Sequence, residues 1–198
     1  MVEVKATTRK TMKMAIGNFI SAGVIFHNQG KRDVSLSLIC SSLDATSKKV
    51  YPDDNNNQRN KKFIRKYMHI ITNFGFPGIL ATGIRIKCIN IPHLTTDNKG
   101  YVGIEDIIYH TIRCGLVHEC EIENLIEFTD ETIIDDFNVK FKVPKQLFWG
   151  LALAVILCEQ NKNEKSEDTV IINIGKRDYS IDELWGKEND LRQIFTKK

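Results

Sequence analysis

Apolar residues recur every three or four positions over the first third of the chain, which is the spacing of amphipathic helices. The spacing predicts a helix over residues 8–28, a second from Asp33 as N-cap to residue 50, and a third over 58–73. Each of these helices has a single apolar face, so the three must pack against one another to bury it. The pattern therefore predicts a helical bundle.

The rest of the chain mixes strand and helix patterns. Alternation of apolar and polar residues predicts short strands over residues 84–88, 122–128, 137–143 and 170–174. We expect the second and third of these to form a hairpin. Further helices are predicted over 103–118 and over the uninterrupted apolar run 147–158, whose first turn Pro144 can occupy. Residues 180–183 have capping-box spacing and predict a last short helix.

The length of 198 residues fits a single core, and no internal repeat or long linker divides the sequence. We expect one domain of mainly α class with small β-hairpin additions. It would consist of a flexible tail over 1–7, a helical core over 8–158, and a mobile surface loop, hairpin and terminal helix over 159–198. The apolar run 147–158 is too short to cross a bilayer, so no membrane partner is expected.

Composition narrows the function classes only slightly. Hydrophobic residues at 42% and charged residues at 27% exclude collagen-like, low-complexity and wholly disordered chains. A net charge of +3 permits a polyanionic partner without requiring one. The five cysteines include no CxxC pair, which indicates neither a disulfide framework nor a common zinc site and favours a cytoplasmic location.

The predicted helix 103–118 carries an arginine and a histidine five residues apart, Arg113 and His118. Arginine can stabilise charge on phosphate oxygens, and histidine can transfer a proton near neutral pH. With an RNA 2′-hydroxyl as nucleophile, the pair would suffice for phosphodiester cleavage without a metal. On an ideal α-helix both residues face away from the apolar side but lie about 140° apart, so either the long arginine side chain or an unwound end near Gly115 would have to close the gap. A surface salt bridge or a helix-end histidine is the alternative interpretation.

The segment from Arg113 to His118 resembles the signature of HEPN domains, an arginine and a histidine separated by four residues. The Ser-Leu-Asp-Ala pattern containing Asp44 and the stretch 59–67 are also similar to that family, and the resemblance covers residues 8–158. It implies an all-helical module with a cleft between two subunits. Arg113 would stabilise the scissile phosphate there and His118 would act as general acid or base, leaving a cyclic phosphate and a 5′-hydroxyl.

The function implied by the resemblance is a metal-independent endoribonuclease in defence or stress response, with no cofactor. Its implied partners are a second copy of the chain in a homodimer, an RNA, and a cognate antitoxin or regulatory protein. Active members often have a polar residue after the arginine, where this chain has Cys114. The alternative is therefore a non-catalytic nucleotide-binding or protein-interaction module of the same fold.

Several further residues are candidates for lesser roles. The substrate-binding candidates are Tyr109, His110, Arg59, Lys62 and Lys66, although a solvated helix face also explains the last three. Asp44 and Cys114 would support the site, with a salt bridge or a helix cap as the alternative role of Asp44. A metal site on the helix is not expected, because His110 and His118 would lie about 12 Å apart along its axis.

Overall fold

Helices make up most of the fold, so the mainly α class with small strand pairs is confirmed. The computed structural model describes residues 16–76, 78, 83, 85–87, 94, 96–119, 126–130 and 141–190. Its helices are α1 (Ile16–Asn28), α2 (Arg32–Val50), α3 (Asn56–Lys66), α4 (Met68–Gly75), α5 (Ile104–Ile107), a π-helix (Ile108–Glu119) and α6 (Leu147–Leu157). Its strands are β1 (Arg85–Lys87), β2 (Tyr101–Gly103), β3 (Ile126–Thr129), β4 (Phe141–Pro144), β5 (Ile171–Ile174) and β6 (Arg177–Ser180).

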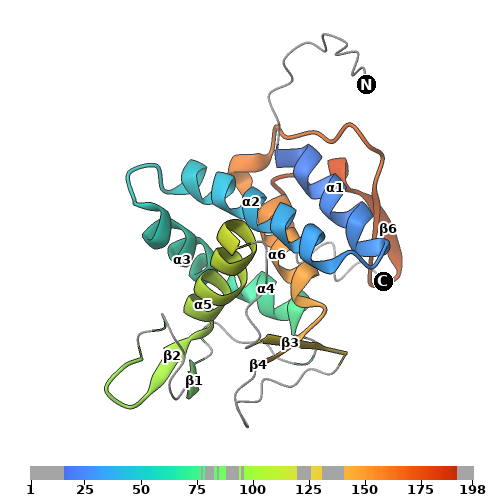
Figure 1. Cartoon of the computed structure of the whole chain (residues 1–198). Helices are drawn as coiled ribbons and strands as arrows, with labels where there is room; N and C mark the ends of the chain where they lie inside the picture. The colour runs from blue at the N-terminus through green and yellow to red at the C-terminus, as the bar shows by residue number, and fades with distance from the viewer. Residues whose placement is uncertain are drawn as a thin grey trace, which may run out of the picture.

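The centre of the bundle is α6, as its continuous apolar sequence predicts. Residues 151–157 are at most 1% exposed, because α2 and α4 pack against this helix (Figure 1). Pro144 is the last residue of β4 and does not begin the helix, which starts at Leu147 after a turn. Within the described residues, none of the helices combines the length and the apolar character that a bilayer span requires.

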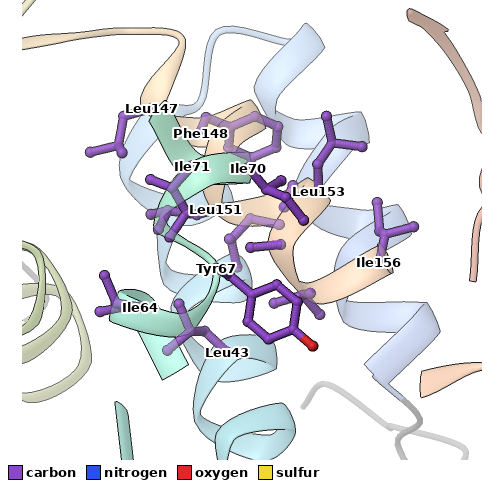
Figure 2. Packing of buried hydrophobic residues seen from close by; sticks show 14 of the residues in the cluster. Leu43, Ile64, Tyr67, Ile70, Ile71, Leu147, Phe148, Leu151, Leu153 and Ile156 are labelled. Carbon is purple, nitrogen blue, oxygen red and sulfur yellow. The ribbon is translucent and has the colours of Figure 1, made fainter. Parts of the chain in front are cut away.

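Two glycines allow α4 and α6 to lie in close contact. A Cβ atom on Gly150 would lie 2.5 Å from the carbonyl oxygen of Ile71, and one on Gly75 would lie 3.1 Å from the Cα of Leu147. Around this contact, Ile70 and Ile71 of α4 pack among the leucines of α6 (Figure 2). The close approach brings the apolar faces of both helices into one core.

The third predicted helix is two helices in the structure, because the chain breaks at Tyr67. There φ is −96° and ψ is 14°, and α4 begins at the next residue. The Tyr67 ring is fully buried (Figure 2), and its hydroxyl donates a hydrogen bond of 2.9 Å to Glu188. Because of the break, α3 packs against α2 whereas α4 packs against α6. The apolar spacing continues through Tyr67, so the sequence pattern does not reveal the break.

Helix α2 begins two residues earlier than predicted. Its N-cap is Lys31, and Asp33 lies in the first helical turn instead of capping it. A carboxylate in this turn is still favourable, because it lies near the positive end of the helix dipole. Gly30, with a φ of +73°, forms the turn between α1 and α2.

The prediction that residues 122–128 and 137–143 form a hairpin is wrong. Strands β3 and β4 pair in parallel, with Ile126 opposite Phe141 and Thr129 opposite Pro144. A parallel pair requires the connecting chain to return to the end where the first strand began. Alternation of apolar residues predicts strands but not their relative direction, which explains the error.

The predicted strand over 170–174 and the predicted capping box are both confirmed. Strand β5 pairs antiparallel with β6 across a turn containing Gly175. The Ser180 side chain accepts a backbone hydrogen bond at the start of the short helix Ile181–Glu183, and the Glu183 side chain accepts from the backbone of Ser180. The strand predicted over 84–88 is β1, and it pairs antiparallel with β2, which the sequence did not predict.

The segment predicted as a mobile surface loop, residues 160–168, is bound to the first two helices. Asn161 is fully buried and donates a 2.9 Å hydrogen bond to the Thr46 hydroxyl. Glu164 accepts hydrogen bonds from Lys49 and from the backbone of Gly17. Polar residues here serve as partners for polar groups of the core, so their hydrophilicity does not indicate mobility. The predicted tail over 1–7 lies outside the described residues.

Candidate functional site

The helix that carries the predicted pair is mainly a π-helix. The chain passes from the short helix α5 into a 12-residue π-helix that contains both Arg113 and His118. In a π-helix, hydrogen bonds join residues five positions apart, so residues at this spacing lie closer to one side of the helix than they do in an α-helix. The α-helical expectation of about 140° between them does not apply. The π-helical backbone therefore reduces the angle between the two positions, without an unwound end near Gly115.

Arg113 lies in the interior, which corrects the prediction that it faces away from the core. The residue is 6% exposed, and its Nε donates to both carboxylate oxygens of Asp44 in α2, at 3.1 and 3.0 Å. Its Nη2 also donates to Asp44. The prediction used the residue spacing of an α-helix, whereas the π-helical backbone turns Arg113 towards α2. The alternative role of Asp44 as a salt-bridge partner is thereby confirmed.

The Arg113 guanidinium keeps its charge in the interior of the protein. Burial alone would lower the pKa of Arg113, but the hydrogen bonds and the charge of Asp44 outweigh burial and raise it. One turn before Asp44, burial and the neighbouring carboxylate raise the pKa of the Cys40 thiol to about 12. The thiol therefore stays protonated, and the guanidinium and the carboxylate balance each other in this part of the core.

Tyr109 lies between two cations. Its ring centre is 5.5 Å from the Arg113 guanidinium carbon and 5.7 Å from the Lys61 ammonium nitrogen, distances at which a cation is attracted to an aromatic face. Lys61 also forms a 2.5 Å ion pair with Asp106. Burial is the main cause of the raised pKa of Tyr109, so its hydroxyl remains neutral. At 6% exposure Tyr109 supports Arg113 more than it offers a stacking surface.

Sequence reasoning missed Lys61 and Asp106. Lys61 belongs to the basic run of α3, but nothing in the linear pattern distinguishes it from its neighbours. Only the packing of α3 on α5 and the π-helix brings it to Tyr109.

Two further predicted residues of the π-helix, His110 and Cys114, lie beside Tyr109 and Arg113. His110 is half-buried, and its ring meets Tyr109 edge-on at 5.0 Å. The half-buried Cys114 places its sulfur 3.9 Å from Nη1 of Arg113. The backbone of His118 is part of the π-helix, while its side chain lies outside the described residues.

Of the three predicted basic residues of α3, Lys62 and Lys66 have contacts away from Arg113. Lys62 is exposed, pairs with Asp54 at 2.7 Å and lies 5.7 Å from the Tyr51 ring. Lys66 is exposed and lies 5.2 Å from the Tyr67 ring. Arg59 is half-buried. These contacts are typical of a solvated helix face that also packs on neighbouring aromatic rings.

Comparisons with known proteins give a family. No curated protein and no solved structure matches the chain significantly. Among the described residues, no three histidine, cysteine or acidic side chains gather as metal ligands would. A model of the Rv1289 family matches residues 15–198, a range that includes Asp44 and the whole π-helix. The chain therefore belongs to the Rv1289 family.

Proposed function

We propose that the protein is a metal-independent endoribonuclease in which Arg113 and His118 act together on one phosphodiester. The observation that carries the proposal is the π-helix. Helices of this type are rare and occur frequently at functional sites. Residues five apart lie closer to one side of such a helix than of an α-helix, and five is the spacing of the arginine and the histidine, which supports the proposal.

In the proposed reaction the RNA 2′-oxygen attacks the adjacent phosphorus. The new O2′–P bond forms as the P–O5′ bond breaks, which leaves a cyclic phosphate and a 5′-hydroxyl. His118 acts as the base that accepts the proton of the 2′-hydroxyl or as the acid that protonates the leaving 5′-oxygen, and water exchanges the other proton. Arg113 stabilises the negative charge on the phosphate oxygens. Asp44 accepts hydrogen bonds from the Nε and Nη2 groups of Arg113 and so fixes the orientation of the guanidinium.

The proposed site is completed by a second copy of the chain. In the family that the motif resembles, the arginine and histidine of two subunits share one cleft, and we propose a homodimer formed through the π-helix. Light scattering on the purified protein tests this directly. A monomer that cleaves RNA at full rate would contradict a shared site.

A second candidate function is a non-catalytic nucleotide-binding or protein-interaction module. It is favoured by the burial of Arg113 and by its hydrogen bonds to Asp44. An arginine held in this way stabilises the packing of the π-helix on α2. Phosphate chemistry then requires the guanidinium to become accessible.

Incubation with end-labelled single-stranded RNA in EDTA separates the two candidates. For the enzyme we expect fragments ending in a cyclic phosphate, with cleavage abolished in His118→Ala and in Arg113→Ala. His69→Ala is the matched control, because His69 is an exposed histidine of α4, and it should cleave like the wild type. Uncut RNA with folded wild-type protein rejects the enzyme and leaves the binding module.

Cys114→Asn adds a test that does not remove a proposed catalytic group. It introduces a polar residue of the kind that often follows the arginine in active members of the resembled family. We expect cleavage to be retained or increased. Loss of cleavage in folded Cys114→Asn would contradict the proposed site, because a polar residue at this position is common in active members of the resembled family.

A further inference from the structure

We propose that the β1–β2 hairpin is a docking surface for single-stranded RNA, on which Tyr101 stacks against a base and Arg85, Lys87 and Lys99 contact the flanking phosphates. The inference rests on the proposed function only in taking RNA as the ligand. The hairpin projects from the helical bundle beside α5 (Figure 1). It is separate from the buried Arg113 cluster.

The register of the two strands gives this hairpin one cationic face. Tyr101 lies directly opposite Lys87, and Gly103 lies opposite Arg85. Directly opposed residues of an antiparallel pair share a face, and alternate residues of a strand do so as well. Arg85, Lys87 and Tyr101 therefore lie together, and all three are exposed. The opposite face carries Val102, which is 1% exposed, and packs on the core.

Tyr101 is the exposed aromatic residue of this surface. Its exposure is 37%, and among the described side chains no other phenylalanine, tyrosine or tryptophan is exposed. Cations surround it, with Lys87 across the strand pair and Lys99 two residues before it. The described part of the hairpin, residues 85–87 and 94–103 without 95, contains three cationic side chains and one carboxylate, Asp97. Aromatic rings alternating with cations are the combination by which proteins bind single strands.

Asp97 fixes the cationic face in place. One carboxylate oxygen accepts hydrogen bonds from the backbone nitrogens of Lys99 and Tyr101, at 2.8 and 2.9 Å. The other accepts from Arg85 at 2.9 Å. The two backbone hydrogen bonds are the main reason that the pKa of Asp97 is lowered, so these contacts persist at neutral pH. A surface that is already ordered loses less conformational freedom when a ligand binds.

The hairpin is also continuous with the proposed catalytic helix. Gly103 ends β2 and is at the same time the N-cap of α5, which runs into the π-helix. Arg65 of α3 pairs with Glu105 at 2.7 Å and adds a further exposed cation next to this junction. An RNA strand bound to the hairpin would therefore lie at the start of the segment that leads to Arg113.

RNA fits this surface better than an anionic membrane does. Membrane-binding surfaces present several apolar side chains to the lipid together with their cations. The described residues of the hairpin face present a single aromatic ring that has a polar hydroxyl, between separate cations. One stacking ring with a cation on either side matches a base between two phosphates.

Fluorescence anisotropy with a labelled 2′-O-methyl oligouridine tests the proposal, because this probe cannot be cleaved. Loss of base stacking in Tyr101→Ala should weaken binding about tenfold. Lys87→Glu and Lys99→Glu should each weaken binding and reduce its salt dependence. Lys176→Glu is the matched control, since it makes the same charge change in the turn of the β5–β6 hairpin and should leave binding unchanged.

The outcomes distinguish this inference from the proposed nuclease. Binding that depends on the hairpin, together with uncut unmodified RNA, supports the docking surface and rejects the nuclease. Cleavage of unmodified RNA, together with an affinity for the oligouridine that is unchanged in all three hairpin variants, supports the nuclease and rejects the docking surface. Anionic phosphatidylserine vesicles that bind through Tyr101 and Lys87, with no binding of the oligouridine, would overturn RNA as the ligand. If Tyr101→Ala fails to fold, the two lysine variants decide whether the hairpin binds RNA.

Discussion

The Arg113 guanidinium and the Asp44 carboxylate form an ion pair between the π-helix and α2, and the arginine is only 6% exposed. Both residues could be selected from the sequence, Arg113 by its spacing from His118 and Asp44 by the pattern around it. Their contact could not be predicted, because 69 residues separate them and the pairing depends on how the π-helix packs on α2. The sequence thus identified two residues of the site but not the orientation of the guanidinium.

At this scale we predict that removing one partner of the pair is costly. Asp44→Ala leaves a buried guanidinium without its carboxylate and should lower the free energy of unfolding by about 2–3 kcal/mol in urea denaturation. The double variant Asp44→Leu/Arg113→Met removes both charges and should recover most of this loss.

Asp54→Ala is the control for this prediction. It removes the partner of the exposed Lys62 and should lower the free energy of unfolding by less than about 1 kcal/mol. Equal effects of Asp44→Ala and Asp54→Ala would mean that the buried pair contributes no more than a surface pair.

At the scale of elements, the apolar pattern predicts which segments are helical but not how each helix is wound or where it breaks. Over a short segment, the spacing of apolar residues does not distinguish a π-helix from an α-helix. The break at Tyr67 is also invisible to that spacing. The buried helix α6, by contrast, was predictable because its sequence is apolar on every side. Helix type and strand direction depend on contacts between elements, which one sequence does not specify.

The contact between α4 and α6 leads to a prediction opposite to the usual one for a helical glycine. Gly→Ala inside a helix ordinarily stabilises by about 1 kcal/mol. At Gly150 the new methyl group would lie 2.5 Å from the backbone oxygen of Ile71, which cannot move without shifting α4. We expect Gly150→Ala to destabilise the protein by about 1–3 kcal/mol and to lower the Tm measured by circular dichroism.

Gly23→Ala is the comparison for Gly150→Ala. Its added methyl group would lie 2.9 Å from the end of the Ile39 side chain, which can rotate, so the cost should be smaller. A larger loss of Tm in Gly23→Ala than in Gly150→Ala would contradict this account of the α4–α6 contact.

At the scale of the whole molecule, residues 159–168 join the late part of the chain to the first two helices. Ser166 lies 2.6 Å from the hydroxyl of Ser21, and the backbone of Glu167 donates to Asn18 at 3.1 Å. Composition alone predicted a mobile loop, since it cannot show that a polar residue has a buried partner.

We predict that Asn161 controls protease access to this segment. Asn161→Ala removes the hydrogen bonds to Thr46, Val155 and Lys49, so trypsin should cut after Lys162 and Lys165 faster than in the wild type. Asn163→Ala alters an exposed asparagine two residues away and should leave the cleavage rate unchanged. Equal rates in the two variants, or rapid cleavage of the wild type, would show that the segment is not held by Asn161.

The attachment of residues 164–167 to α1 also constrains the order of events on the ribosome. Their hydrogen-bond partners in α1 are synthesised 145–149 residues earlier. During translation, part of the surface of α1 therefore remains uncovered until these residues have been made. Final closure of the domain must come late in synthesis, which gives a folding chaperone time to bind this helix before the chain is released.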